Sequence, residues 1–579
     1  MPLQRMRAWL VVGCAGFCAL LNSYSDPRPA SASEMERLLP VAMRPSASGP
    51  AARASQRSTP SRSDSLPPLG RPAYLVPSLD PALHSLVMRI ADDAGAPLAS
   101  LAGTWGPDVR HTYSKQQPWS SDNALLVIEN RSPGSPPRLF LDGSTYAPRF
   151  GPCAQDSLYD FRWHPSPAHP RELINVDFTG TRLSWFDVTQ CRATRAWTLP
   201  ITVNYGIGSG EGNPSDDGRF IALGNDSAAF VVDMDPQPPF APYPSARIGP
   251  VVTLPPCSLS TSGVVSCAIA NLSISASGRY LDVKYAGSDD STFEAHRIFE
   301  VDSVTLGLRP HLMAGSSLRC GSFAVRPNGW IFPLKHSDLT RDPFDHDEDI
   351  IVGARACPGS ALGHVIKVRL RDGAVTPLTD PQNEAAVSHV STRNLDRPGW
   401  AYVSYFKDGD RRQSDEIVAV KLDGSGTIEH YAHDHSLTPG CYRCEAQPVP
   451  SRDGRRVLFA SNWAADCGDS CGSPGDIKDY VAWIPDAPPP ASGLRVEGVV
   501  PDPAVGLPRV VYSLAGPEPA TLEVVDIAGR RLFRRELGAP GPGRHAESLD
   551  GSGRVPPGVY LVRVSQAGRS ASRKLVILR

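Results

Sequence analysis

The feature that most constrains the fold is a turn-plus-strand element that recurs along the middle of the chain. Each copy has a small or proline-containing lead-in, a polar turn that often ends in Asp-Gly or Asn-Gly, and then a run of β-forming apolar residues. The copies begin at Pro118, Arg162, Asn213, Ser273, Ala324, His389 and Pro448. Their spacing of about 44 to 65 residues fits one four-stranded sheet per copy.

Sheets that repeat at this period form a β-propeller, so the copies predict seven blades within residues 72–485. Residues 451–462, SRDGRRVLFASN, resemble the repeat of TolB-type, WD40-like propellers, and residues 217–222 and 277–280 are weaker copies. The resemblance implies a fold and no particular activity, because propellers include both binding modules and enzymes.

The composition agrees with an all-β chain. The 579 residues include 50 glycines and 58 prolines, which is too many turn-forming residues for a helical protein. Hydrophobic residues make up 41%, enough to form a core, and the net charge of −2 gives no polybasic surface for nucleic acid.

The amino terminus has the pattern of an export signal. Two arginines within residues 1–7 precede an apolar run at residues 8–21 and then a polar stretch, so we expect a signal peptide over residues 1–25. The run is too short to span a bilayer, and no second span follows in the expected mature chain. Residues 11–14 also resemble a lipobox, in which case Cys14 would be lipidated. Residues 26–71, rich in Ser, Pro and Ala, predict a disordered spacer.

The last part of the chain is set off by a proline-rich linker at residues 486–493. Residues 494–579 contain alternating strands with glycine turns, including ATLEVVDIAGRRLFRREL and VPPGVYLVRV. They resemble the FlgD-type immunoglobulin-like domain and the similar type A sorting domain of type IX secretion. The resemblance implies an immunoglobulin-like β-sandwich that contacts secretion machinery or attaches the protein to a surface. Asp502 departs from the sorting pattern, which usually has Pro-Asn-Pro.

Ten cysteines remain after the expected signal peptide, an even number that favours disulfides in an exported protein. Six form sequence-local pairs, and the last four have the form C-x2-C…C-x3-C. For these four we expect two disulfides, with zinc as the alternative. The pairs are Cys153/Cys191, Cys257/Cys267 and Cys320/Cys357, and the last four are Cys441, Cys444, Cys467 and Cys471.

Histidines in the later repeats are the first candidates for chemistry. His336 and His389, with Arg393, are candidate catalytic residues. His433 and His435 share a face if their segment is extended, and with Gln447 they are candidate metal ligands. This cluster loosely resembles the histidine-plus-glutamine metal site of oligogalacturonate lyases, whose metal neutralises a uronate carboxylate, but the spacing of that motif is not reproduced.

A carboxylate run gives a second candidate site. Asp345, Asp347 and Asp349 can supply oxygen ligands to calcium, although the glycine and the distal glutamate of an EF-hand loop are absent. The only cofactor expected is therefore a divalent metal, calcium or manganese.

Two functions remain open at this stage. The first is an exported or surface-displayed propeller that binds a glycan, a peptide or a protein partner. The second is a polysaccharide lyase that uses a histidine-lined channel, which requires a base, a carboxylate neutraliser and usually a metal. Convergence of the four histidines on one channel mouth would favour the lyase.

Overall fold

The computed structural model describes residues 69–80, 82–154, 158–204, 211–255, 267–287, 294–314, 324–355, 363–380, 383–409, 411–465, 472–485, 494–500, 509–514, 518–539, 543–549, 556 and 558–577. The predicted signal peptide, Cys14 and nearly all of the predicted spacer lie outside these residues. The chain divides into two compact units, and the second begins at Ile484. No helix in the described part of the chain is long and apolar enough to span a membrane.

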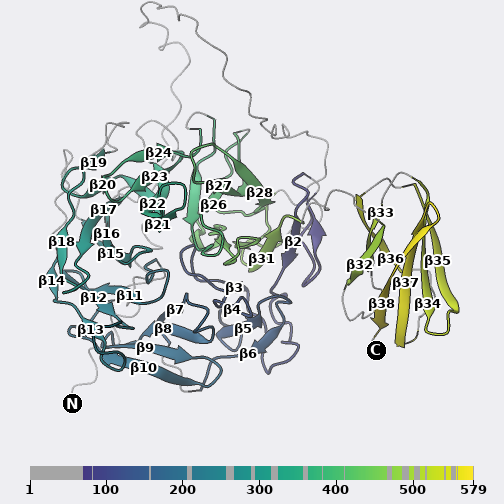
Figure 1. Cartoon of the computed structure of the whole chain (residues 1–579), viewed down its shortest axis with the longest axis horizontal. Coiled ribbons are helices and arrows are strands. Elements are labelled where there is room, and N and C mark those ends of the chain that lie inside the picture. Colours follow the sequence, from purple (N-terminus) through teal and green to yellow (C-terminus); the bar gives the residue numbers. More distant parts are fainter. Residues whose placement is uncertain are drawn as a thin grey trace, which may run out of the picture. The chain divides into compact units, whose positions relative to one another are not determined.

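The first unit is a series of antiparallel sheets that follow one another around a ring (Figure 1). In Figure 1 the first strand of a sheet (β7, β11, β15 or β21) lies toward the middle of the ring, and the last strand lies toward the outside. The early sheets contain β3 (Asp108–Arg110), β4 (Leu125–Asn130), β5 (Arg138–Asp142) and β6 (Pro148–Phe150); β7 (Asp160–Trp163), β8 (Glu172–Val176), β9 (Arg182–Asp187) and β10 (Arg192–Thr198); and β11 (Phe220–Gly224), β12 (Ala228–Asp233), β13 (Arg247–Ile248) and β14 (Val252–Thr253).

The later sheets follow the same order. They contain β15 (Cys267–Ile274), β16 (Tyr280–Gly287), β17 (Glu294–Val301) and β18 (Leu308–Pro310), joined by β19 (Ala324–Arg326) and β20 (Trp330–Phe332); β21 (Leu334–Asp342), β22 (Glu348–Arg355), β23 (Val365–Arg369) and β24 (Val375–Pro377); and β25 (Val387–Ser391), β26 (Trp400–Tyr405), β27 (Glu416–Lys421) and β28 (Ile428–His433). A short 3-10 helix, η1 (Tyr442–Cys444), comes next.

The ring is closed by strands from the two ends of the unit. Val87 lies opposite Ala482, in an antiparallel pairing of β2 with β31. Arg71, predicted to belong to the spacer, contacts Asp476 at 2.5 Å, so ordered structure begins before residue 72. The closing strands are β1 (Ser78–Leu79), β2 (Leu86–Arg89), β29 (Val449–Pro450), β30 (Arg456–Ser461) and β31 (Ile477–Trp483).

The recurring sequence element forms the same turn in several sheets. The amide of Ser215 donates to Phe220 O at 2.9 Å, and the amide of Ser451 donates to Arg456 O at 2.7 Å. Each of these turns contains a glycine with positive φ, 75° at Gly218 and 65° at Gly454. At Gly218 a Cβ would lie 2.4 Å from the His164 ring, so glycine is required there for space as well as for conformation.

The element at Ala324 does not begin a sheet of its own. Its Asn-Gly turn joins β19 to β20, and β20 pairs with β17 at the edge of the preceding sheet. The next sheet begins instead with β21 and β22, and the carboxylate run of residues 345–349 covers the end of their connecting turn and the start of β22.

The second unit consists of two antiparallel sheets that share one apolar core. Val510 and Tyr512 from the first sheet and Leu522 and Val562 from the second belong to the same buried cluster. The first sheet contains β32 (Arg495–Val500), β33 (Arg509–Leu514) and β36 (Gly543–Ser548); the second contains β34 (Ala520–Asp526), β35 (Arg531–Gly538), β37 (Gly558–Gln566) and β38 (Arg569–Ile577).

Candidate functional site

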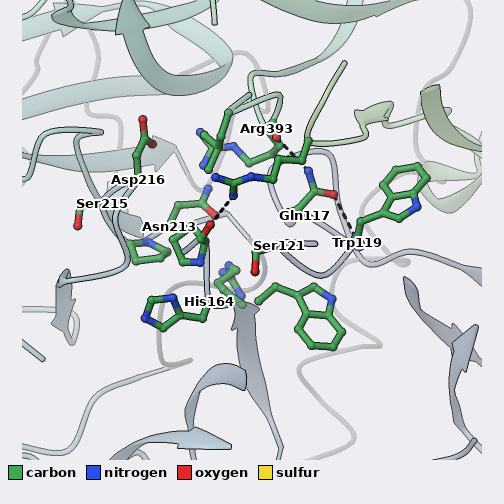
Figure 2. Close-up of a pocket in the computed structure, with 14 residues that line it drawn as sticks. Gln117, Trp119, Ser121, His164, Asn213, Ser215, Asp216 and Arg393 are labelled. Atoms are coloured by element: carbon green, nitrogen blue, oxygen red, sulfur yellow. Dashed lines mark hydrogen bonds between the residues drawn. The ribbon is translucent and has the colours of Figure 1, made fainter. Parts of the chain in front are cut away.

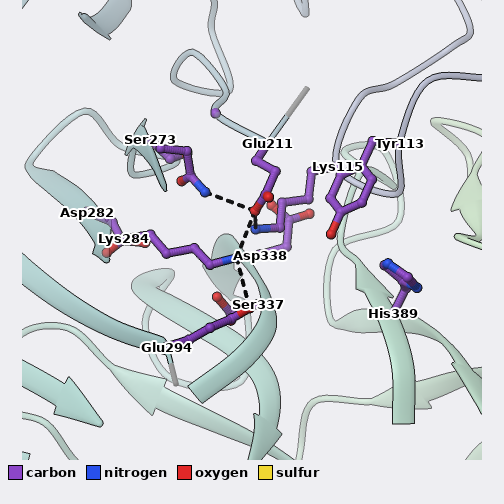
Figure 3. Close-up of polar contacts among 12 residues, drawn as sticks. Tyr113, Lys115, Glu211, Ser273, Asp282, Lys284, Glu294, Ser337, Asp338 and His389 are labelled. Carbon is purple, nitrogen blue, oxygen red and sulfur yellow. Dashed lines mark hydrogen bonds and ion pairs between the residues drawn. The ribbon is translucent and has the colours of Figure 1, made fainter. Parts of the chain in front are cut away.

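A cluster of ionisable and aromatic side chains brings together residues from several sheets and loops of the first unit (Figure 3). His336 is on β21 and His389 is on β25. Lys115 and Glu211 come from loops before the turns of their own repeats. We call this set, together with Tyr113, Lys284, Glu294 and Tyr442, the polar cluster.

The two histidines of the polar cluster lie against each other, with ring centroids 4.6 Å apart. His389 Nε2 lies 3.2 Å from the hydroxyl of Tyr442, which is itself 3.3 Å from the hydroxyl of Tyr113. Burial lowers the pKa of His336 to about 4, and burial together with the nearby His336 lowers the pKa of His389 well below its usual value. At neutral pH these side chains are therefore uncharged rings with hydrogen-bonding edges.

Glu211 is at the centre of an ion-pair network. Its Oε2 lies 2.9 Å from Lys115 Nζ, from Lys284 Nζ and from Asn271 Nδ2. Burial alone would raise the pKa of this carboxyl group, but the two ammonium groups outweigh burial and lower it strongly. Lys284 also lies 3.3 Å from Glu294 Oε1. The charges of the polar cluster are therefore largely neutralised by one another.

Two polar atoms of the cluster remain without a hydrogen-bond partner among the described residues. They are Nδ1 of His336 and Oε2 of Glu294, and both atoms are buried. A buried polar atom without a partner costs about 1–3 kcal/mol, so each favours a bound hydroxyl group or a water. Together they offer a ring nitrogen and a carboxylate acceptor to a ligand.

Arg393 is bound by Asp338. Its Nε and Nη2 each donate to one carboxylate oxygen of Asp338 at 2.9 Å, and Nη2 also donates to Leu339 O at 2.6 Å. Most of its donors are therefore used in joining β21 to the segment after β25. The described contacts of Arg393 are structural, and its catalytic role stays a prediction.

His433 and His435 form a separate pair. His433 ends β28, the last strand of the sheet in which β25 is first. Three inter-strand spacings separate these two strands, about 14 Å. His433 Nδ1 lies 3.3 Å from Asp80, and the ring of His435 lies 4.5 Å from that of Trp463. The four histidines thus do not converge on one channel mouth.

The expected face shared by His433, His435 and Gln447 does not form. His435 has a φ of 52°, so the segment is not extended there, and the rings of His433 and His435 lie 6.0 Å apart. Gln447 instead accepts a hydrogen bond from Arg110 Nη2 at 2.6 Å. Among the described residues, no group of three or more His, Cys, Asp or Glu side chains is arranged to hold a metal ion.

The calcium candidates are also dispersed. Asp345 pairs with Arg369, while Asp349 is buried and accepts hydrogen bonds from Ser275 Oγ at 3.1 Å and from the Ser277 amide at 3.0 Å. Asp347 is in the left-handed conformation, with a φ of 53°. Asp345 and Asp349 thus have protein partners on different elements.

Two of the expected disulfides are present, Cys153–Cys191 and Cys441–Cys444. The second excludes Cys441 and Cys444 as zinc ligands. Cys467 and Cys471, as well as Cys257, Cys320, Cys357 and the side chain of Cys267, lie outside the described residues.

Sequence reasoning missed most of the polar cluster. Lys115 and Glu211 are 96 residues apart, and nothing in either local sequence indicates the other. The available signal was position: both residues come just before the turn of a repeat, where a propeller places residues near its axis.

No family model and no curated protein matches the chain. Among solved structures, an oligogalacturonate lyase in complex with manganese is 13% identical and covers 72% of this chain and 98% of its own, with a TM-score of 0.39. The β-propeller domain of Myceliophteria thermophila Swd1 is 12% identical and covers 64% and 97%, with a TM-score of 0.34. Saccharomyces cerevisiae Sqt1 is 10% identical and covers 74% and 98%, with a TM-score of 0.31. The chain is structurally similar to β-propeller proteins, and the similarity concerns the fold alone.

Proposed function

We propose that the first unit is a seven-bladed β-propeller whose polar cluster binds a hydroxyl-rich ligand, a glycan. The observation that carries the proposal is the buried His336–His389 pair. Its rings are neutral, His336 Nδ1 has no partner among the described residues, and Glu294 supplies an acceptor nearby. Neutral donors and acceptors beside aromatic rings suit sugar hydroxyls, and the paired lysines leave little charge for an ionic ligand.

The pairing of the strands supports this blade count. A group of antiparallel strands begins with each of β3, β7, β11, β15, β21 and β25, and a seventh group combines β29, β30 and β31 with β2. The first and seventh groups are joined into one nine-stranded sheet by the parallel pairing of β3 with β31. Closure of the last sheet by an amino-terminal strand is what a ring without free edges requires.

We further propose that the chain is exported and that its second unit is an immunoglobulin-like module for secretion or attachment. The two sheets around one core support the sandwich. The disulfides Cys153–Cys191 and Cys441–Cys444 support an oxidising destination, because such bonds are rare in cytosolic proteins.

The alternative is a polysaccharide lyase at the same cluster. Lys115 and Lys284 have the chemistry of a carboxylate neutraliser, and His389 that of a base. Both ammonium groups already contact Glu211, however, and His433 ends the outer strand of its sheet, with His435 two residues beyond it. Binding without turnover is therefore the better-supported function.

The test measures the binding of the mature chain and of two variants to a glycan array. His389→Ala removes a ring of the polar cluster, and His433→Ala is the matched control on the outer strand. We expect saturable binding of one glycan class, lost in His389→Ala and kept in His433→Ala. Equal binding by all three proteins, or no binding to any glycan, would refute the proposed site. Release of unsaturated uronate products, followed by ultraviolet absorbance, would establish the lyase instead.

The second unit is tested by fusing residues 494–579 to an exported reporter in a host with type IX machinery. We expect the reporter at the cell surface. A reporter that stays in the periplasm would show that the unit does not direct secretion and acts as a spacer.

A further inference from the structure

A second polar site lies in a crevice lined by turns from several sheets (Figure 2). Arg162 is on β7 and His164 directly follows that strand. Asp216 comes from the turn before β11, Arg393 from the segment after β25, and Arg452 from the turn between β29 and β30. Its cavity volume is about 30 Å³. That is room for about two waters or one small polar group, and too little for a sugar ring.

Arg162 contributes a donor to this crevice that no described residue uses. Its Nε donates to Gly212 O at 2.7 Å and its Nη1 to Asp160 Oδ1 at 2.6 Å. Its Nη2 is buried and has no hydrogen-bond partner among the described residues, and the whole residue is only 2% exposed. Leaving such a donor unsatisfied is costly, so its position favours a bound acceptor.

His164 also lines the crevice and has a ring nitrogen that no described residue uses. Its Nδ1 accepts a hydrogen bond from the Ser166 amide at 3.1 Å, so in the neutral ring the proton is on Nε2. Burial lowers the pKa of His164 to about 3, which keeps the ring neutral. Nε2 is buried and has no partner among the described residues.

The charges around the crevice are asymmetric. Three arginines line it, whereas Asp216 is the one carboxylate among the lining residues. The aspartates that pair with Arg162, Arg393 and Arg452 are Asp160, Asp338 and Asp396, and none of these lines the crevice. Positively charged side chains therefore outnumber carboxylates among the lining residues.

We propose that this crevice binds a small oxyanion, a carboxylate, sulfate or phosphate group. A planar guanidinium and a ring N–H are the donors that recognise such groups. The bound oxygens would satisfy Arg162 Nη2 and join turns from sheets far apart in the chain. The inference concerns a site separate from the polar cluster and does not rest on glycan binding there.

The test is calorimetric titration of the mature full chain at low ionic strength. Inorganic phosphate, sulfate and acetate serve as free-anion probes, and a sulfated oligosaccharide and a galacturonate trimer carry the same groups on a sugar. We expect saturable binding of at least one probe, weakened at least tenfold in Arg162→Lys. Arg219→Lys is the matched control, because Arg219 pairs with Asp233 at 2.7 Å and does not line the crevice. The probe class that binds more tightly identifies the source of the anion.

A second variant keeps the proposal testable if Arg162→Lys does not fold. Asp216→Asn removes the carboxylate that competes with an anion, so we expect binding several-fold tighter at pH 7. In the unmodified chain the affinity should also rise as the pH falls through about 6, the pKa of Asp216, which burial raises. The charged groups that face Asp216 are Arg393, Arg341, Asp349 and Asp217. Binding equal in all variants, or absent for every probe, would show that only water occupies the crevice.

Discussion

Arg393 and Asp338 join two neighbouring sheets through a bidentate ion pair, with both N–H···O distances at 2.9 Å. Both side chains are buried, and Asp338 also accepts hydrogen bonds from the amide and hydroxyl of Thr392 at 2.8 and 2.9 Å. Blade-to-blade contacts in the first unit are thus polar as well as apolar. This geometry makes Arg393 a measurable determinant of stability.

Arg393→Ala should lower the free energy of unfolding by about 3–5 kcal/mol, because it leaves the Asp338 carboxylate buried without its partner. Urea unfolding followed by tryptophan fluorescence measures this. The control is Arg309→Ala, whose pair with Glu300 is exposed and should contribute less than about 1 kcal/mol. An equal loss of unfolding free energy in the two variants would contradict the stabilising role of the Arg393–Asp338 pair.

Glu211→Gln should destabilise the first unit by about 3 kcal/mol. It removes the negative charge between two buried ammonium groups, and we expect the low end of the range for broken buried pairs because the Glu211 side chain is 22% exposed. Added salt should recover part of the loss if repulsion between Lys115 and Lys284 is the cause. An unchanged midpoint would mean that the network contributes nothing to stability.

Stability should fall as the pH is lowered from 6.5 toward 4. In the unfolded chain His336 takes up a proton near pH 6.5, whereas in the folded chain burial delays protonation to about pH 4. Between these values the unfolded state binds more protons, so acid favours unfolding. His336→Gln should reduce this dependence of stability on pH. The measurement is the urea midpoint of unfolding at pH 7, 6, 5 and 4.5. An identical slope in the variant would show that other groups cause the pH dependence.

The two described disulfides should contribute unequally. Cys153–Cys191 closes a loop with a sequence separation of 38 and Cys441–Cys444 one of 3. Loop-closure entropy predicts losses of about 4 and about 2 kcal/mol on replacing each pair by serine. Thermal unfolding of the two double variants tests the order, and the reverse order would contradict it. Alkylation of the denatured, unreduced protein should detect no free thiol.

Closure of the ring should contribute more to the stability of the first unit than the presence of the second unit does. Val87→Asp places a charge in the fully buried β2–β31 pairing and should cost more than 3 kcal/mol, whereas Val304→Asp, at a residue 64% exposed, should be nearly neutral. A chain ending at residue 485 should unfold at the same midpoint as the first unit of the full chain. A lower midpoint would assign the second unit a structural role.

The repeats could be read from sequence because their turns are local. The Ser215 and Ser451 turns are each formed by five or six consecutive residues. The Asn-Gly turn at Gly329 has the same signature but joins β19 to β20, since the partner of β20 is β17, a tertiary choice that a turn motif does not carry.

The candidate site was predicted only in part for a related reason. His336 and His389 were identified and do meet. His433 was placed with them because sequence does not show which strand of a sheet faces the axis. The left-handed conformation of His435, with a φ of 52°, is likewise set by its surroundings and not by its own sequence.

The pairing of Leu86 with Trp483 also sets the order of events during synthesis. A ribosome makes the chain from its amino terminus, so β2 waits without its partner until residues 477–483 have emerged. Until then β2 and β30 both present open backbone edges, which are templates for pairing with another chain. A nascent chain that stalls before Ile477 is therefore the species most prone to aggregate, and a holding chaperone has most to protect at that stage.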